Sequence, residues 1–392
     1  MIRWPDGCYA EENGIGPQSR RRPNARPMWD DLDANSPGTD EFIALCRRVG
    51  AEPLIVINTG RHDRRTPRAA YLQEALDWIE YCNGPATSRW GAVRAAHGHP
   101  EPYRVRLWEI DNETWESGLE TYIDILREFA PAMRRADPSI VLLACGGADA
   151  DLGRFHRWDP RLIEACADLF DVLSIRHYER PDRFADGPAR DERWYSDLRD
   201  LIARSRNPAL KLYVSEWNAQ STDWRTGLYA GSIARERRGD VVTLAAPALF
   251  LRHVSARAWD NALINFDAAG WFPAPNYVVM KLWWDHFAPE QVALEDAAEP
   301  LNAVATRAGD NRVILKVVNP VAEPFVVEVR PTAGQWRDAA LTLVATGSLR
   351  ARNTLSEPTA VAPRAADIRL VDGAARFERP PHAAAVAVLR RH

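Results

Sequence analysis

The sequence has few cysteines, and they form no pattern. Its 392 residues contain five, which are spread at long intervals with no CxxC pair: Cys8, Cys46, Cys82, Cys145 and Cys166. An odd, scattered set is typical of free thiols in a reducing compartment and not of a disulfide framework. The nine histidines show no metal-ligand spacing with these cysteines. We therefore expect no disulfides, no bound metal and no cofactor.

Long hydrophobic runs and a charge excess are also lacking. No stretch of about 18 apolar residues is present that would span a bilayer, and the N-terminal MIRWPDGCYA has neither the basic nor the apolar region of a signal peptide. Lys and Arg number 50 against 54 Asp and Glu, a formal net charge of −4. Such a balance does not attract nucleic acid or an anionic membrane. We expect a soluble, cytoplasmic protein whose partner is neutral or small.

Core-forming residues, in contrast, are plentiful. Hydrophobic residues make up 46% of the chain, and 15 of them are tryptophans. This content excludes a disordered chain and predicts a sizeable core. Tryptophan faces serve equally as core filler and as platforms for sugar rings, so the count does not choose between these roles.

Short aliphatic segments alternate with helical patterns over the first 287 residues. Seven segments are expected as strands: 1–4, 52–60, 103–113, 139–147, 171–179, 210–218 and 261–267. Between them, 38–50 is predicted as a helix with Thr39 as its cap and Gly50 as its stop, and 121–139 as a helix that Pro138 ends. Alternating strands and helices indicate parallel strands with crossover helices.

Polar residues follow the predicted strands at their carboxyl ends. They are Asn58, Asn112 with Glu113, His177 with Tyr178, Glu216 with Asn218, and Asp267. Chemistry occurs on this face of a closed (β/α)8 TIM barrel, whereas a doubly wound sheet favours a Gly-rich first loop that this sequence lacks. A barrel needs eight strands and seven are counted, so one strand is expected to be missing or hidden.

After about residue 288 the pattern changes to short alternating strands. They are expected within 303–320, 324–331, 341–347, 367–380 and 384–391, with turns at Gly309-Asp310-Asn311 and Asp372-Gly373. This spacing predicts an antiparallel β-sandwich. The expected domains are a barrel over 1–287, incomplete at its N-terminus, and a β-sandwich over 288–392.

Two strand-end carboxylates are candidates for catalysis. Glu113 lies in IDNET and Glu216 in VSEWN, and the stretch between them is long enough for three βα units. Hydrolysis of a glycosidic bond needs one protonated carboxyl and one carboxylate across the anomeric carbon. The alternative is that both are barrel-stabilising charges bound to Arg or Trp. Since each lies beside an Asn and near a Trp, the functional interpretation is favoured.

The sequence resembles glycoside hydrolase family 51, the intracellular α-L-arabinofuranosidases, over nearly its whole length. The segments that carry the resemblance are RWPDGCYAEE with GIGP, 38–60, 81–115 with its IDNETW, 215–231 with its SEWN, 259–287, 353–370 and 378–389. The Asn-Glu pair alone marks a broader clan of barrel glycosidases, but the ordered set is more specific. Family members carry a first barrel strand upstream of the point where this chain starts, so the resemblance implies a barrel that lacks this strand.

The resemblance implies a retaining mechanism in which Glu216 attacks the anomeric carbon and Glu113 protonates the departing oxygen, then activates water. Retention needs the carboxyl groups about 5 to 5.5 Å apart, and at that separation the charge of Glu216 is expected to raise the pKa of Glu113. Asn112 would donate to the sugar 2-hydroxyl; its alternative role is a turn Asn that bonds its own backbone.

Further substrate-binding residues are implied by the same family. Tyr178 would steady the nucleophile and His177 would line the pocket, although a core Tyr or His is an equal alternative for each. Trp217 packs beneath the nucleophile or fills the barrel. Cys8 matches a substrate-lining position but is also ordinary packing, and Trp271 walls the subsite or simply covers the surface.

The resulting hypothesis is an exo-acting α-L-arabinofuranosidase that releases terminal arabinofuranosyl residues from arabino-oligosaccharides. Family resemblance also implies a homo-oligomer, commonly a hexamer. A second hypothesis keeps the mechanism and changes the sugar, as in a β-xylosidase or endo-glucanase. A third is a truncated barrel without activity that binds carbohydrate or a partner subunit.

Overall fold

The computed structural model forms two compact units. It describes residues 1–5, 9, 11–26, 31–61, 63, 65–148, 157–232, 238–257, 259–295, 300–309 and 311–391. The first unit comprises Met1–His177, Ser196–Ser215 and Asp240–Ala246, and the second comprises Tyr178–Tyr195, Glu216–Gly239 and Pro247–His392. The expected domain boundary near residue 288 stays a prediction.

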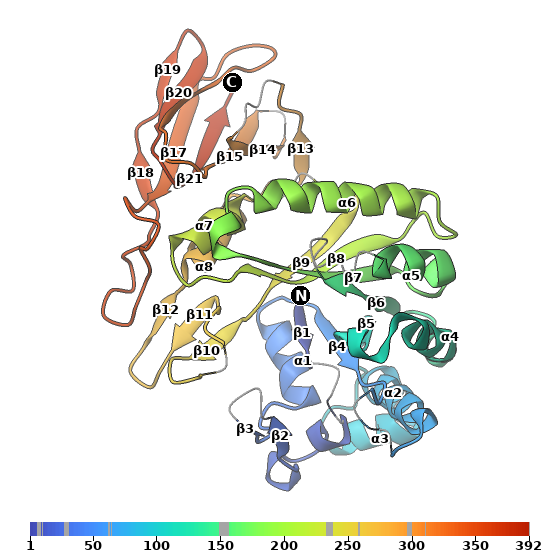
Figure 1. Ribbon diagram of the computed structural model, residues 1–392. Coiled ribbons are helices and arrows are strands. Elements are labelled where there is room, and N and C mark those ends of the chain that lie inside the picture. The colour runs from blue at the N-terminus through green and yellow to red at the C-terminus, as the bar shows by residue number, and fades with distance from the viewer. Residues whose placement is uncertain are drawn as a thin grey trace. The chain divides into compact units, whose positions relative to one another are not determined.

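A seven-stranded sheet forms the centre of the first unit (Figure 1). Its strands are β1 (Ile2–Trp4), β4 (Pro53–Ile57), β5 (Leu107–Ile110), β6 (Val141–Ala148), β7 (Val172–Glu179), β8 (Lys211–Ala219) and β9 (Val242–Pro247). They follow one another in chain order, and the pairs from β1 to β7 are parallel. This is the strand arrangement of a (β/α) barrel, so the predicted fold class is confirmed. From Tyr178 in β7 and from Glu216 in β8, the strands continue into the second unit.

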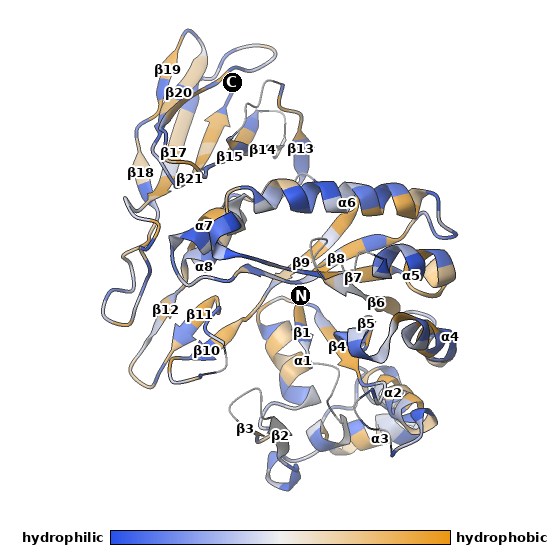
Figure 2. Cartoon of the chain, in the orientation of Figure 1, coloured by the Kyte–Doolittle hydropathy of each residue, from blue (hydrophilic) through white to orange (hydrophobic). Residues whose placement is uncertain are grey.

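Helices connect the parallel strands, as the sequence pattern predicts. They are α1 (Thr39–Arg48), α2 (Arg68–Asn83), α3 (Arg89–Ala96), α4 (Leu119–Ala136), α5 (Trp158–Cys166) and α6 (Gly187–Ala203). Short 3-10 helices lie at Glu11–Gly14, Gln18–Arg20, Thr114–Ser117, Ala167–Leu169 and Pro181–Arg183, and β2 (Asn24–Arg26) pairs with β3 (Asp31–Asp33). Figure 2 shows hydrophobic residues concentrated in strands such as β4 and hydrophilic residues along α6.

The cap of α1 differs from the prediction. The N-cap is Gly38, whose amide donates to Glu41 at 2.9 Å, and Thr39 is the first helical residue. Thr39 is buried and its hydroxyl accepts a 3.1 Å hydrogen bond from the Trp78 indole, so it is not free to cap the helix. The stop is as predicted, because Gly50 has a φ of +67° that favours glycine.

The second unit contains α7 (Trp224–Gly231), α8 (Pro275–Asp285) and a small sheet of β10 (Leu251–His253), β11 (Ile264–Phe266) and β12 (Trp271–Pro273). The prediction that 261–267 is the seventh parallel strand is therefore wrong. Its strand β11 pairs with β10 in parallel and with β12 in antiparallel orientation. The seventh strand of the large sheet is β9, whose Pro247 and partial exposure obscure the strand pattern in the sequence.

The C-terminal strands form the predicted sandwich of antiparallel sheets. One sheet has six strands in the order β13-β14-β15-β21-β17-β18, and the other has three in the order β16-β20-β19. Their bounds are Glu290–Val292, Asn302–Arg307, Arg312–Asn319, Ala383–Arg390, Asp338–Ala345 and Arg364–Ala366 for the first, then Phe325–Val329, Ala374–Arg379 and Arg369–Val371. Leu315, Leu343 and Trp336 pack against Phe377 and Ala385 in its core.

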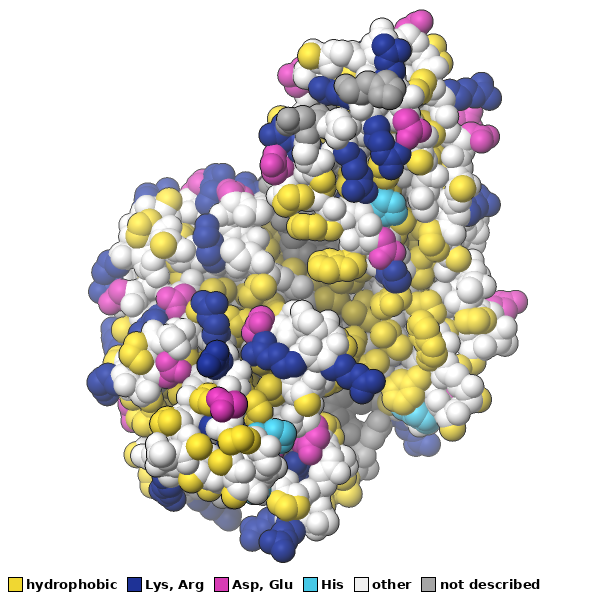
Figure 3. Space-filling view, turned by 180° about the vertical axis from the view of Figure 1, so that it is seen from behind, with side chains coloured by type: hydrophobic (Ala, Val, Ile, Leu, Met, Phe, Trp, Pro, Cys, Tyr) yellow, Lys and Arg dark blue, Asp and Glu magenta, His cyan; other side chains and the backbone are white. Residues whose placement is uncertain are grey.

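Charged side chains of both signs lie on the face of the molecule that Figure 3 shows, beside hydrophobic ones. Within the described residues, no helix combines the length and apolar character needed to cross a membrane.

Candidate active site

Two residues that follow β5 have left-handed backbone conformations. Asp111 has a φ of +65° and Glu113 a φ of +51°, and Asn112 lies between them. The carbonyl of Ile110 accepts a 2.7 Å hydrogen bond from the buried Tyr122 hydroxyl, which fixes the end of the strand. Left-handed conformations of non-glycine residues cost free energy and often occur at functional sites. The turn therefore presents Asn112 and Glu113 in a defined orientation.

The side-chain amide of Asn112 is held by two arginines. Its Oδ1 accepts hydrogen bonds from Arg3 Nη2 at 2.7 Å and from Arg176 Nη2. Arg3 lies on β1 and Arg176 on β7, so strands on both sides of β5 orient the same oxygen. Among the described residues, Asn112 Nδ2 has no acceptor in the protein, and its two N–H groups can donate to a ligand.

Glu113 lies next to the same guanidinium. Arg176 Nε is 3.7 Å from Glu113 Oε1, and the Arg176 guanidinium also lies over the Trp115 ring, 5.6 Å from its centroid. The side chain of Arg176 is 1% exposed, whereas that of Glu113 is 42% exposed. A buried cation thus lies behind a carboxyl group that solvent or a ligand can reach.

Asp111 points into the protein. Its carboxylate accepts hydrogen bonds from the Thr59 hydroxyl and from the Asn112 amide, and Arg61 Nε lies 3.6 Å away. Burial raises the pKa of Asp111 to about 6, against the opposing effects of Arg61 and of the Thr59 hydrogen bond. Asp111 is buried and anchors the turn.

Glu109 is likewise a structural charge. It is fully buried on β5, where it forms an ion pair with Arg3 and accepts a 2.6 Å hydrogen bond from the Ser174 hydroxyl. Arg3 therefore joins Glu109 to Asn112. Glu109 thus stabilises the arginine that orients Asn112.

In the second unit, Tyr178 and Glu216 are brought together. The Tyr178 hydroxyl donates to Glu216 Oε2 at 2.8 Å. The Tyr178 ring packs edge-on against Trp259, with centroids 5.0 Å apart. A hydrogen bond from a tyrosine fixes the rotamer of a carboxylate and stabilises its charge. The hydrogen bond links the C-terminal parts of β7 and β8, and the roles of both residues toward a substrate stay predictions.

The residues that follow Glu216 are buried. Trp217 is 1% exposed and packs against Tyr229, so its contribution to a site is through packing. Asn218 donates to the Ala248 and Asn261 carbonyls and accepts from Thr226 and Asn276. This network anchors the end of β8 to the rest of the second unit.

The remaining predicted residues are placed differently from one another. His177 is buried at 2% exposure near the end of β7, and Trp271 on β12 is 57% exposed. Cys8 lies outside the described residues. For all three, the substrate-binding roles stay predictions.

The described residues contain no group of three His, Cys, Asp or Glu side chains arranged for a metal.

Arg3 and Arg176 are site residues that the sequence interpretation missed. Each contacts Asn112, but neither lies in the motifs that mark Asn112 and Glu216. A signal was present, because a charged residue within a strand that is otherwise buried is rare unless it is paired. Ser174 and Arg176 are two residues apart on β7, so their side chains lie on the same face of the strand. Ser174 donates to Glu109 on β5, and Arg176 donates to Asn112 in the turn that follows β5.

Comparison with known proteins identifies similar families. The family described as alpha-L-arabinofuranosidase 1 domain matches residues 1–196. An intracellular exo-alpha-(1->5)-L-arabinofuranosidase of Acetivibrio thermocellus is 30% identical over 238 residues, which cover 56% of this chain and 46% of that protein. An extracellular exo-alpha-L-arabinofuranosidase of Streptomyces chartreusis is 27% identical over 76% of this chain and 38% of that protein. The chain thus spans about half the length of the curated relatives it matches, or less.

Solved structures are similar over a larger share. The alpha-L-arabinofuranosidase of Thermotoga maritima, in an arabinose complex, matches with a TM-score of 0.85 and 25% identity, covering 99% of this chain and 87% of that one. The thermostable GH51 alpha-L-arabinofuranosidase of Thermotoga petrophila matches with a TM-score of 0.85 and 26% identity, covering 98% and 86%. The likeness extends through the barrel and the C-terminal sheets.

Proposed function

The chain belongs to the alpha-L-arabinofuranosidase 1 domain family, and from this membership we propose that it is a retaining exo-glycosidase that hydrolyses terminal α-L-arabinofuranosides of arabino-oligosaccharides. The observation that carries the proposal is the 2.8 Å hydrogen bond from Tyr178 to Glu216. A carboxylate with a fixed rotamer and a stabilised charge at a strand end suits the nucleophile of a double displacement. No metal or organic cofactor takes part in the proposed reaction.

In the first step, Glu216 Oε attacks the anomeric carbon while the bond to the leaving oxygen breaks. Glu113 gives its proton to that oxygen, so the aglycone departs as a neutral alcohol and a glycosyl ester of Glu216 remains. In the second step, Glu113 takes a proton from water, the water oxygen attacks the same carbon, and Glu216 is released. Two inversions give overall retention.

Asn112 has a supporting role in this proposal. Because Arg3 and Arg176 hold its Oδ1, Nδ2 is directed as a donor. We propose that it donates to the sugar 2-hydroxyl, a contact that strengthens as the anomeric carbon becomes positive. His177 and Trp271 are proposed to line the sugar site, and Trp217 to pack behind it.

The test is a substrate panel on the purified chain. We expect hydrolysis of 4-nitrophenyl α-L-arabinofuranoside and release of arabinose alone from arabino-oligosaccharides. A preference for the β-D-xyloside, or release of longer products, would instead favour the β-xylosidase or endo-glucanase alternative. Calorimetric binding of arabinose without hydrolysis of any substrate would favour a barrel that only binds carbohydrate.

The identity of the nucleophile has a separate test. In Glu216→Gly, azide can occupy the space of the missing carboxylate and attack the anomeric carbon, which gives the inverted arabinofuranosyl azide. Failure to detect this adduct, in a variant that stays folded, would count against Glu216. A cytoplasmic location and a homo-oligomer, commonly a hexamer in the family, are further proposals that fractionation and light scattering test.

A further inference from the structure

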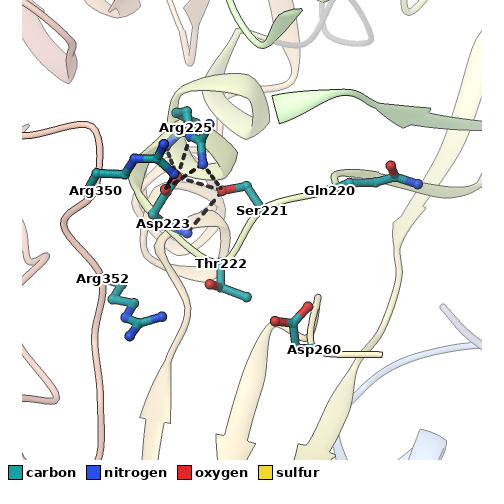
Figure 4. A pocket seen from close by; sticks show the side chains of 8 residues that line it. All are labelled: Gln220, Ser221, Thr222, Asp223, Arg225, Asp260, Arg350 and Arg352. Atoms are coloured by element: carbon teal, nitrogen blue, oxygen red, sulfur yellow. Dashed lines mark hydrogen bonds and ion pairs between the residues drawn. The ribbon is translucent and has the colours of Figure 1, made fainter. Parts of the chain in front are cut away.

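A polar pocket lies in the second unit, beyond the end of β8. Its volume of about 420 Å³ is within the usual range for small-molecule sites. Every lining side chain is polar or charged: three arginines, two aspartates and three neutral residues. A ligand held here depends on hydrogen bonds and charge, since the pocket offers no aromatic or aliphatic wall. Figure 4 shows Arg350 and Arg352 on one side of the pocket, with Asp260 and Gln220 across it.

One of the three arginines, Arg225, is paired with a carboxylate of the protein. Arg225 Nη2 lies 2.7 Å from Asp223 Oδ2, and its Nε donates to Oδ1 at 2.9 Å. Although burial opposes it, hydrogen bonds from Arg225 and Ser221 hold the pKa of Asp223 below its ordinary value, so this pair is ionised and neutral overall. Asp223 also caps α7 by accepting from the Arg225 amide.

The other two arginines retain donors for a ligand. Arg350 Nη1 is 3.5 Å from Asp223 Oδ2, but its side chain is 78% exposed, so solvent screens that contact. Arg352 has no ion-pair partner among the residues that the structure describes. With the Asp223 and Arg225 pair neutral, two guanidinium groups face one remaining carboxylate, that of Asp260. The pocket carries a net positive charge.

The loop that carries Arg350 and Arg352 is anchored. Asn353 is 3% exposed, and its Nδ2 donates to the Pro273 carbonyl at 3.0 Å and to the Val361 carbonyl at 3.1 Å. Its Oδ1 accepts from the Val361 amide at 2.7 Å. The loop is thereby tied to β12 directly beside Arg352, which reduces the conformational entropy that a ligand must remove on binding.

The pocket is connected to Glu216 through residues of the same unit. Gln220 follows Glu216 by four residues, and its amide donates to the Glu179 carbonyl at 2.8 Å. On the other wall, Asp260 follows Trp259, which packs against Tyr178, the residue that donates to Glu216. Residues on both walls of the pocket are thus continuous with, or in contact with, residues that neighbour the proposed nucleophile.

We propose that this pocket binds a uronic acid in the leaving-group part of the substrate, with Arg350 and Arg352 on its carboxylate. Guanidinium groups match a planar carboxylate, and the lining hydroxyl, amide and Asp260 groups suit sugar hydroxyls. A phosphate is disfavoured, because its second negative charge would face the Asp260 carboxylate and its volume fills little of the pocket. The inference rests on the proposed function for the position of this sugar, but the pocket's preference for anions can be measured without catalysis.

The test is calorimetric titration of the whole chain with galacturonic acid and with galactose, which differ in the carboxylate at C6. We expect galacturonic acid to bind at least about tenfold more tightly, and this preference to weaken with salt because partly exposed charges are screened. In the double variant Arg350→Gln and Arg352→Gln, the ratio of the affinities for galacturonic acid and galactose should fall to about one. Arg364→Gln, which changes an exposed arginine on β18 outside the pocket, should leave it unchanged.

The outcomes separate the two proposals. If the aryl arabinofuranoside is hydrolysed but galacturonic acid binds no more tightly than galactose, or the double variant keeps the preference, the pocket inference is wrong and the proposed function stands. If galacturonic acid is preferred through Arg350 and Arg352 but no arabinofuranoside is hydrolysed, the anion pocket stands and the proposed function fails. Unchanged thermal unfolding in the double variant shows that the loss is local.

Discussion

The Tyr178 hydroxyl donates a 2.8 Å hydrogen bond to the Glu216 carboxylate, and the two residues lie in the C-terminal parts of β7 and β8. Trp259 packs against the Tyr178 ring and limits its movement. The Glu216 carboxylate is thus held in one orientation before a substrate binds. This prior orientation lowers the cost of reaching the transition state.

Tyr178→Phe removes this hydrogen bond and keeps the ring. Since hydrogen bonds to charged groups contribute about 1.5 to 3 kcal/mol, we expect kcat/KM for 4-nitrophenyl α-L-arabinofuranoside to fall by about 10- to 100-fold. Thermal unfolding should change little. Tyr277→Phe on α8 is the matched control and should keep wild-type kinetics. Wild-type kcat/KM in Tyr178→Phe would show that the hydroxyl does not assist Glu216.

Asn112→Asp distinguishes the role of Oδ1, which accepts from the two arginines, from that of Nδ2, the proposed donor to the substrate. The carboxylate still accepts from Arg3 and Arg176, but the Nδ2 donor is replaced by an acceptor. We expect kcat to fall by about 10²-fold or more, as when one transition-state donor is removed, without a loss of stability. For a 2-deoxy substrate, which lacks the proposed partner of Nδ2, the same substitution should lower kcat far less. Equal losses for both substrates would contradict a contact to the 2-hydroxyl.

Arg3→Met tests the pairing at the base of the site. Glu109 is fully buried and would lose its cation, and breaking one side of a buried pair costs about 3 to 5 kcal/mol. We expect the free energy of unfolding in urea to fall by that order. The double variant Arg3→Met with Glu109→Leu should recover part of the loss, because no buried charge is left alone. Additive losses in the double variant would exclude the coupling.

Asp159 predicts a pH dependence of stability. It is 3% exposed near the start of α5, and burial raises its pKa from 3.8 to about 7, opposed by a hydrogen bond from the Gly147 amide. Between about pH 4 and pH 7 the folded chain binds more protons at this residue than the unfolded chain, so its contribution to stability falls as the pH rises. We expect Asp159→Asn to raise the melting temperature at pH 8 and to have little effect at pH 4. The same shift at both pH values would contradict the assignment.

Strands and helices of the barrel were predictable because their patterns are local. β4 and β6 are short, continuous apolar runs, and α4 shows the helical period in the sequence. β9 was not predicted, since Pro247 ends a run that is only partly buried, and the segment with β11 resembles a barrel strand more closely. Which strands pair is decided by contacts between distant residues, and these leave no local signal.

The candidate site divides in the same way. Short motifs near strand ends make Asn112, Glu113, Tyr178 and Glu216 candidates from the sequence alone. The contacts of Arg3 and Arg176 with Asn112 join strands that lie far apart in the chain. The pocket beyond β8 likewise combines residues near 220, 260 and 350, which no sequence pattern connects.

The proposal that Glu113 and Glu216 share one glycosidic cleavage is tested most directly by the rate of hydrolysis of 4-nitrophenyl α-L-arabinofuranoside. We expect Glu113→Gln to lower kcat/KM by about 10²- to 10⁴-fold and Glu216→Gln by a factor on the order of 10⁴ or more. The control is Glu116→Gln, an exposed carboxyl on the helix Thr114–Ser117 that follows Glu113, which should hydrolyse at the wild-type rate. Wild-type rates in both Glu113→Gln and Glu216→Gln would contradict the account.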